Sequence, residues 1–375
     1  MNILLEGIFY NGHGFAEGNR ILLRILYRAG YQVRILARDS HEKNLVLDPK
    51  EVAFISSFEK NKLRSNDIYL CNFVGSSIRY NPDFRINIAR TTFETDRIPD
   101  DWVPELNKFN EVWVQSTFNV DTFAKSGVEV PLRLIPNFFD INAYDLCVKP
   151  LSLPVSKSFL FLAVFDLQQR KGYDILLEAF LNEFSQMDDV ALVVKIRNSG
   201  GIHKLESIID EHHKSKREMP TIYMIDQMLT TRELLGLYKS CHAFVLPTRG
   251  EGWGRPFFEA MLMEMPVIGT GWSGQTDFMN ESNAFLVQVD RLIRIKNSDY
   301  PMFNGHLWAQ PSIQDLQNKM RYVFEHAAES KQMGKKARSD LLRTYKPNEI
   351  AARVTKELNK FQAEEGENSE HLIGW

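Results

Sequence analysis

The sequence predicts an α/β protein of two domains, each a parallel β-sheet covered by helices. Short apolar runs alternate with segments of helical periodicity through most of the chain, which is typical of this fold class. The 375 residues are enough for two separate cores. Residues 148–155 contain two prolines and little periodicity, so they predict the linker between the domains.

The N-terminal half begins with a strand, a glycine-rich loop, a helix and a second strand within residues 3–37. The loop spacing Gly12-x-Gly14-x-x-x-Gly18 differs from the dinucleotide-binding fingerprint. The loop either covers a phosphate, which makes Gly14 a candidate donor contact, or only turns the chain. His13 is a candidate ligand contact, although a solvated loop histidine is the more frequent case.

Beyond this unit, strands are predicted at residues 52–55, 67–73, 85–89, 111–114 and 131–135. Ser116 is predicted to cap a helix that runs through residue 126. The loop of residues 91–99 follows a strand, at the edge where open parallel sheets bind ligands. Glu94 and Asp96 are therefore candidate acceptor-binding or proton-handling groups. The alternative is a pair of solvated acids partly paired with Arg97.

The C-terminal half repeats the alternation. Strands are predicted at residues 159–164, 190–196, 221–225, 243–247, 266–270 and 284–287, and we expect the strand at 284–287 to be the last of the chain. Helices are predicted at residues 173–184, 202–214, 230–239, 256–265, 316–328, 330–342 and 347–361, followed by a mobile tail of residues 362–375. Arg170 and Lys171 precede the first of these helices. Two cations there suit a diphosphate, or they form a basic surface loop.

The most informative stretch is residues 248–260, a glycine-rich loop between an apolar strand and a helix. Its glycines let backbone N–H groups approach a ligand, and the N-terminus of the helix favours an anion. Glu251 lies in the loop and Glu259 on the helix. Two carboxylates beside an anion site are expected to accept hydrogen bonds from hydroxyl groups, as sugars and riboses provide. The alternative is a surface loop followed by an ordinary helix glutamate.

The net charge, the cysteines and the absence of long apolar stretches indicate which partners and which cell compartment to expect. The net charge of -3 gives no electrostatic attraction to nucleic acid. Cys71, Cys147 and Cys241 match no metal-binding spacing and fit a reducing cytosol. The first residues run directly into a strand, so no signal peptide is expected. No apolar stretch approaches the ~20 residues that a helix needs to span a bilayer. We expect a cytoplasmic protein with at most peripheral membrane contact.

The stretch from Glu251 to Glu259 resembles the Glu-x7-Glu signature of family 4 glycosyltransferases with the GT-B fold. The resemblance is carried by Glu251-Gly252-x-Gly254-x-Pro256-x-x-Glu259-Ala260, Pro266-Val267-Ile268, Gly274, Lys171-Gly172 and Ile135-Pro136-Asn137 before Asp140. It is strongest over residues 159–290. It implies two Rossmann-like domains facing a central cleft. Residues 1–150 and the returning helix 347–361 would form the acceptor side, and residues 157–346 would bind the nucleotide-sugar.

The same resemblance implies a retaining transfer that needs no metal or other cofactor. Glu259 would hold the ribose hydroxyls, Glu251 would contact the donor sugar, and Lys171 would neutralise the departing diphosphate. The remaining residues expected on the donor side are Arg170, Arg197, Asp226, Gly252, Trp253, Gly254 and Arg255. On the acceptor side the expected residues are Glu94, Asp96 and His13.

Two positions depart from the family pattern. Asp166 stands where the family often has an arginine, and we expect Arg170 to supply that charge. No histidine occurs between His41 and His203, and we expect Glu94 to take the place of the family's N-terminal histidine. The first hypothesis is transfer of a hexose from a nucleotide-sugar, with UDP-glucose as the first guess, to a saccharide or lipid-linked acceptor in polysaccharide synthesis. The alternatives are a GT-B phosphorylase or epimerase-like enzyme and a non-catalytic nucleotide-sugar-binding module.

Overall fold

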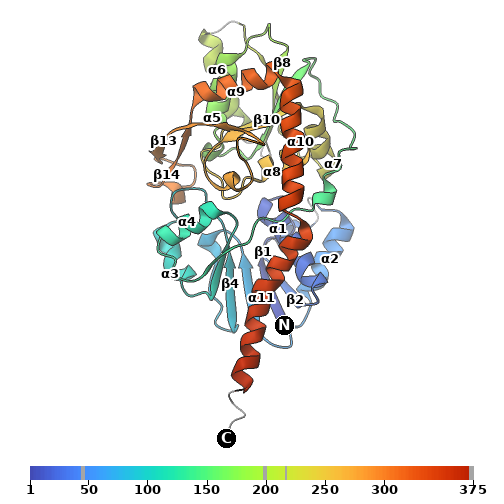
Figure 1. Cartoon of the computed structure of the whole chain (residues 1–375), viewed down its shortest axis with the longest axis vertical. Helices are drawn as coiled ribbons and strands as arrows, with labels where there is room; N and C mark the ends of the chain where they lie inside the picture. The colour runs from blue at the N-terminus through green and yellow to red at the C-terminus, as the bar shows by residue number, and fades with distance from the viewer. Residues whose placement is uncertain (44–46, 197–200, 216–217, 371–375) are drawn as a thin grey trace. The chain divides into compact units, whose positions relative to one another are not determined.

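The computed structural model describes residues 1–43, 47–196, 201–215 and 218–370. It divides into two compact units. Unit 1 comprises Met1–Phe93, Arg97–Asp140 and Tyr345–Trp375, and unit 2 comprises Glu94–Asp96 and Ile141–Thr344. Each unit has a six-stranded parallel sheet with helices packed on it, so the predicted α/β class with two Rossmann-like domains is confirmed (Figure 1).

Unit 1 has the strand order β2-β1-β3-β4-β5-β6. Its strands are β1 (Asn2–Gly7), β2 (Gln32–Ala37), β3 (Ile68–Asn72), β4 (Ile86–Arg90), β5 (Glu111–Val114) and β6 (Leu132–Leu134). Its helices are α1 (Gly14–Arg28), α2 (Pro49–Glu59), α3 (Val103–Leu106), α4 (Thr117–Lys125) and α11 (Pro347–Glu370). β3, β4 and β5 are buried along their whole length, as expected for central strands of a parallel sheet covered on both faces.

The C-terminal helix α11 packs on unit 1 (Figure 1). Val354 and Leu358 are fully buried. At the edge of this apolar contact, the Tyr31 hydroxyl donates to Asn359 Oδ1 at 2.7 Å, and the Arg133 guanidinium lies 3.5 Å from a Glu357 carboxylate oxygen. The last helix of the chain is thus part of the first unit's core.

Unit 2 has the strand order β12-β11-β10-β7-β8-β9 and a separate antiparallel hairpin, β13-β14. Its strands are β7 (Phe159–Phe165), β8 (Val190–Ile196), β9 (Thr221–Ile225), β10 (Ala243–Leu246), β11 (Val267–Thr270), β12 (Phe285–Val287), β13 (Val289–Arg294) and β14 (Leu307–Pro311). Its helices are α5 (Tyr173–Glu183), α6 (Ile202–Ser215), α7 (Thr231–Ser240), α8 (Arg255–Leu262), α9 (Ile313–Glu325) and α10 (Ala327–Thr344).

Three expectations about elements were wrong. Residues 52–55 belong to helix α2, because Asp48 caps it through the Lys50 N–H at 2.8 Å and Pro49 occupies its first position. β12 is not the last strand, because the hairpin β13-β14 follows it. Helix α11 continues beyond residue 361 to Glu370, through much of the predicted tail.

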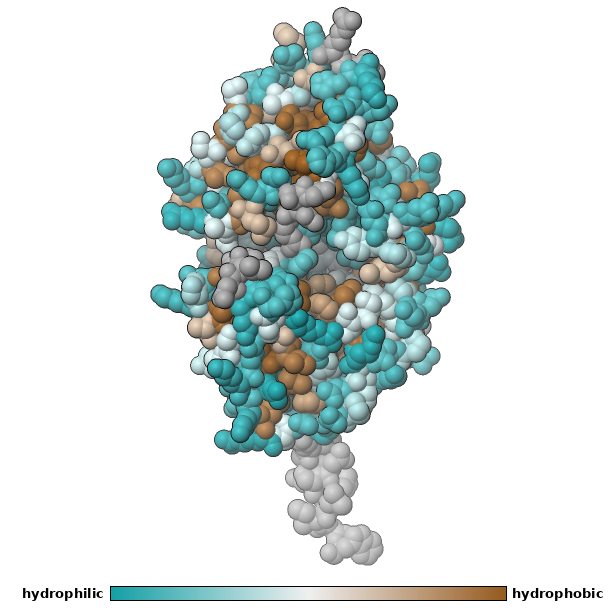
Figure 2. Space-filling view, turned by 180° about the vertical axis from the view of Figure 1, so that it is seen from behind, coloured by the Kyte–Doolittle hydropathy of each residue, from teal (hydrophilic) through white to brown (hydrophobic). Residues whose placement is uncertain are grey.

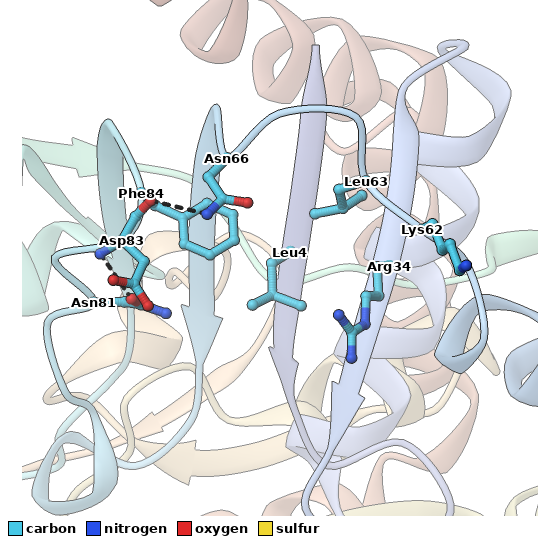
Figure 3. Close-up of a pocket in the computed structure, with 8 residues that line it drawn as sticks. All are labelled: Leu4, Arg34, Lys62, Leu63, Asn66, Asn81, Asp83 and Phe84. Atoms are coloured by element: carbon cyan, nitrogen blue, oxygen red, sulfur yellow. Dashed lines mark hydrogen bonds between the residues drawn. The ribbon is translucent and has the colours of Figure 1, made fainter.

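Neither the hydropathy of the surface seen in Figure 2 nor the pocket in Figure 3 singles out the predicted site residues. The face seen in Figure 2 is mainly hydrophilic, with hydrophobic residues in patches between polar ones. No described helix is long and apolar enough to cross a membrane. A pocket of about 460 Å³ opens on unit 1, lined by Leu4, Arg34, Lys62, Leu63, Asn66, Asn81, Asp83 and Phe84 (Figure 3). None of the residues predicted to bind donor or acceptor lines this pocket.

Candidate active site

The strand order of unit 2 has one point where its direction reverses. From β7 the chain adds β8 and β9 on one side and then returns to place β10 on the other side of β7. Open α/β sheets bind ligands beyond the carboxyl ends of the strands at such a switch point. The loop after β7 carries Arg170 and Lys171, and the loop after β10 carries Glu251. The topology therefore brings the predicted cations and the first glutamate of the motif to one place.

Gly172 lets these two loops touch. It has a left-handed backbone with φ of 68°, and a Cβ there would lie 2.0 Å from the Pro247 carbonyl oxygen. Any side chain would therefore add both strain and a backbone clash. The Arg249 N–H also donates to the Arg170 carbonyl oxygen at 2.6 Å. The two loops are thus held against each other by backbone contacts.

Glu251 is held by both cations. Lys171 Nζ donates to Glu251 Oε1 at 2.6 Å, and Arg170 Nη1 donates to Glu251 Oε2 at 3.0 Å. The side chains of Lys171 and Glu251 are only 7% and 6% exposed. Arg170 and Lys171 therefore do not form a basic surface loop, and Glu251 does not lie in a surface loop.

Glu94 joins the same cluster. Its carboxylate lies 3.5 Å from Arg170 Nη2, and its side chain is mostly buried. Its backbone carbonyl packs on Gly250, where an added Cβ would lie 1.9 Å from the Glu94 oxygen. Glu94 is thus not the solvated acid of the alternative interpretation. Residues 94–96 are the part of the 91–99 loop that belongs to unit 2.

The two carboxylates of the cluster have opposite pKa shifts. Burial raises the pKa of Glu94, an effect that Arg170 and Lys171 only partly oppose. Burial also acts to raise the pKa of Glu251, but the charges and hydrogen bonds of Lys171 and Arg170 outweigh it and the pKa is lowered. Burial and the neighbouring Arg170 lower the pKa of Lys171. The site thus holds a firmly ionised carboxylate beside one that takes up a proton more readily.

Glu259 lies on α8 with a mostly buried side chain. It accepts a hydrogen bond from the Tyr238 hydroxyl at 3.3 Å and lies 3.5 Å from Arg255 Nη2. Trp253 is 3% exposed and packs against Phe278, with ring centroids 5.1 Å apart. Its indole therefore serves the core, which is consistent with the expectation that this loop offers backbone groups to a ligand.

The other predicted site residues are distributed between the units. Asp226 follows β9 in unit 2, two strands away from β7. Arg197 lies outside the described residues. His13 and Gly14 lie in unit 1, where His13 is the exposed residue before α1 and Gly14 begins the helix. Asp96 accepts a hydrogen bond from the Leu307 N–H, described below.

Two contacts that shape the site were missed by sequence reasoning. Ser273 has φ of 77°, and its hydroxyl accepts a hydrogen bond from the Glu251 N–H at 2.9 Å. Arg249 forms a bidentate pair with Asp174 at 2.8 and 2.6 Å. The sequence signal that could have pointed to Ser273 is its place between Gly271 and Gly274, in a polar turn directly after the apolar strand β11. The arginine pair joins residues far apart in sequence and had no such signal.

Comparisons with known proteins find similarity to glycosyltransferases. Residues 156–294 match the family described as Glycosyl transferases group 1. The chain is 24% identical over 313 residues to alpha-1,3/1,6-mannosyltransferase ALG2 of Homo sapiens, covering 76% of this chain and 70% of that protein. It is 28% identical over 119 residues to the capsular polysaccharide biosynthesis glycosyltransferase CapM of Staphylococcus aureus, covering 32% and 30%.

Solved structures are similar over nearly the whole chain. HepE of Anabaena, in complex with UDP and glucose, has a TM-score of 0.66 at 16% identity and covers 96% of this chain and 100% of its own. Sucrose-phosphate synthase of Thermosynechococcus elongatus has a TM-score of 0.69 at 15% identity and covers 97% and 99%. At these identities the likeness shows the fold, which is that of GT-B glycosyltransferases.

The fold and the matched domain define the class of the protein. It is a transferase enzyme of GT-B fold. Residues 156–294, which match the glycosyltransferase group 1 model, include β7 and β10 and the loops after them that carry Arg170, Lys171 and Glu251.

Proposed function

We propose that this protein is a retaining glycosyltransferase that moves a hexose from a nucleotide-sugar to a hydroxyl of a saccharide or lipid-linked acceptor. UDP-glucose is the first donor to test. The observation that carries the proposal is the buried cluster of Arg170, Lys171, Glu251 and Glu94 at the switch point of unit 2. The matched domain and the similarity to a mannosyltransferase and to a UDP- and glucose-bound structure support a nucleotide-sugar donor.

The cluster suits the departure of a diphosphate. Without a ligand, Arg170 and Lys171 are both engaged by Glu251. A diphosphate placed beside them would accept the same N–H donors. Negative charge grows on the diphosphate as the bond to the sugar breaks, so fixed cations there stabilise the transition state more than the ground state. The two side chains supply this charge, and the proposal requires no metal or other cofactor.

The carboxylates are assigned to the hydroxyl-bearing parts of the substrates. Glu251 would release part of its contact with the cations and accept hydrogen bonds from the donor sugar. Glu259, on α8, would hold the ribose hydroxyls, while Gly252, Trp253 and Gly254 offer backbone groups. Asp226 and Arg255 stay predictions for the donor side.

On the acceptor side, Glu94 is the assigned residue, because it is buried beside Arg170 and its pKa is raised. The departing diphosphate oxygen is the proposed base for the incoming hydroxyl, and Glu94 would orient that hydroxyl. His13 and Gly14 stay predictions, as do the cytoplasmic location and at most peripheral membrane contact.

The test is a thermal-shift panel of UDP, GDP, ADP and their glucose, galactose, mannose and N-acetylglucosamine conjugates, run on the wild type and Glu259→Ala. A ligand at 100 times its Kd stabilises the folded state by about 2.7 kcal/mol, which is readily detected. We expect one nucleotide to shift the wild type and to lose its effect in the variant. If no nucleotide shifts the wild type, the donor site as assigned is wrong.

Turnover separates the remaining alternatives. A transferase releases the nucleoside diphosphate from its donor in proportion to glycosylated product. A GT-B phosphorylase would instead depend on free phosphate. A non-catalytic module would bind the nucleotide-sugar but would not hydrolyse it, even slowly, when no acceptor is present.

A further inference from the structure

Four consecutive residues of the hairpin β13-β14 contact both loops that carry the clustered carboxylates. They are His306 and the first three residues of β14, Leu307 to Ala309. His306 and Trp308 are buried, with 7% and 2% of their surfaces exposed. In Figure 1 the hairpin stands apart from the six-stranded sheet of unit 2, so its contacts are not needed to complete that sheet.

One end of this segment holds residues 94–96. The Thr95 hydroxyl and His306 Nδ1 are 2.9 Å apart in a buried hydrogen bond. The Asp96 N–H donates to the Leu307 carbonyl oxygen at 3.0 Å, and the Leu307 N–H donates to Asp96 Oδ1 at 2.5 Å. Three hydrogen bonds thus fix the two residues that directly follow Glu94.

The other end of the segment holds the loop of Glu251. The Ala309 N–H donates to the Arg249 carbonyl oxygen at 2.9 Å, and the Arg249 guanidinium lies 5.7 Å from the centre of the Trp308 ring. The same guanidinium is fixed by Asp174. Arg249 is two residues before Glu251, so β14 is anchored to a rigid point of the donor loop.

We propose that the hairpin sets the separation of Glu94 and Glu251, and that Asp96 and His306 are positioning residues for the transfer reaction. This inference rests on the proposed function. It reassigns Asp96, which was predicted to meet the acceptor, because one of its carboxylate oxygens accepts a backbone N–H instead. Through Thr95 and Asp96, β14 holds Glu94 against Gly250 and within reach of Arg170.

A small displacement of Glu94 should be costly for turnover. A misplacement of about 1 Å in a reacting assembly lowers the rate by as much as about 100-fold. Loss of the Asp96 contact is therefore expected to lower kcat by about 10- to 100-fold. Binding of UDP should change by less than about twofold, because the residues assigned to the nucleotide, Lys171 and Glu259, do not touch the hairpin in any described contact.

The first experiment measures the positioning directly and needs no substrate. Hydrogen exchange of a peptide covering residues 91–99 is compared between the wild type, Asp96→Ala and Asp96→Asn. The asparagine keeps an acceptor oxygen for the Leu307 N–H, so we expect faster exchange in the alanine variant and wild-type exchange in the asparagine variant. Thr95→Val against Thr95→Ser makes the same comparison for the His306 bond. Unchanged exchange in Asp96→Ala and Thr95→Val would overturn the inference.

The second experiment asks whether Asp96 acts through Glu94. Release of UDP from UDP-glucose, or from the donor that the thermal panel selects, is measured for Asp96→Ala, Glu94→Gln and the double variant, with the nucleotide Kd determined in parallel. We expect the double variant to be about as slow as Glu94→Gln alone, because coupled residues are not additive. Additive losses, or a Kd that rises as much as kcat falls, would reduce Asp96 to a structural residue.

The two proposals fail in different ways. If the wild type binds no nucleotide, the proposed function fails whatever the exchange data show. If the wild type binds and turns over donor, but Asp96→Ala keeps wild-type kcat, only the positioning role fails.

Discussion

Two buried carboxylates, one in each unit, lie just beyond the ends of parallel strands and are used differently. In unit 1, Asp39 follows β2 and accepts three backbone N–H bonds, from Phe9, Tyr10 and Asn11, at 2.8 to 3.0 Å. In unit 2, Glu251 follows β10 and is held by the side chains of Arg170 and Lys171. Backbone donors cannot turn to another partner, whereas two side-chain cations can. The difference marks Asp39 as a support of its loop and Glu251 as part of an exchangeable site.

The largest expected effect is that of Glu251→Gln. It leaves Arg170 and Lys171 buried without their carboxylate, and breaking such a pair costs about 3–5 kcal/mol of unfolding free energy. The loss should be partly recovered by UDP, because its diphosphate would neutralise the two buried cations. Urea unfolding with and without UDP measures both. A loss that UDP does not reduce would show that the cations are not available to a diphosphate.

Lys171→Met is expected to lower kcat by about 10²- to 10³-fold, as loss of one fixed group that stabilises transition-state charge does. Its stability should fall as well, because Glu251 then keeps only Arg170 as a hydrogen-bonded cation, so kcat is compared at a temperature where the wild type and the variant are both folded. The matched control is Lys204→Met, at a half-exposed lysine of the same unit, which should keep wild-type kcat. Equal activity of the two variants would remove Lys171 from the mechanism.

Asp39→Ala tests the other carboxylate. Loss of its three hydrogen bonds should lower the unfolding free energy by about 3 kcal/mol, since each leaves a buried N–H without its charged acceptor. The control is Asp48→Ala, a helix cap with one such bond, for which about 1 kcal/mol is expected. Unlike the loss in Glu251→Gln, this loss should not be recovered by UDP. If UDP restored the same unfolding free energy to Asp39→Ala and to Glu251→Gln, the proposed difference between the two carboxylates would be wrong.

The smallest effect has the opposite sign. The pKa of Glu94 is raised in the folded state, so the folded state favours its protonated form, and stability falls as pH rises through the raised pKa. Glu94→Gln should therefore be more stable than the wild type at pH 8. The difference should shrink as the pH falls and vanish below the ordinary carboxyl pKa of about 4.3, where Glu94 is protonated in both states. A melting temperature that is lower in the variant at pH 8 would contradict this assignment.

Most strands and helices of the fold could be predicted from the sequence, but some elements could not. The strands of both sheets were predictable because buried parallel strands are short apolar runs, as in β8 and β10. Residues 52–55 were misassigned because an apolar run of four is ambiguous, and the start signals Asp48 and Pro49 decide in favour of a helix. The hairpin β13-β14 was missed because β13 is largely exposed and polar, without a clear alternation.

The residues of the site could be predicted better than the contacts between them. Arg170, Lys171 and Glu251 follow adjacent strands, so strand order alone brings them together. That Glu94 meets them depends on a hairpin more than two hundred residues later in the chain, and no local pattern encodes such a contact. Asp39 carried no signal either, because its partners are backbone groups and any loop has those.

The central claim is that the two cations exchange Glu251 for a diphosphate. Calorimetric titration of the wild type and Lys171→Met with UDP and with UMP, or with the corresponding pair of the nucleotide selected by the panel, tests it most directly. We predict that the wild type binds the diphosphate at least about tenfold more tightly than the monophosphate, and that this ratio collapses in the variant. A ratio that is the same in both proteins would contradict the claim.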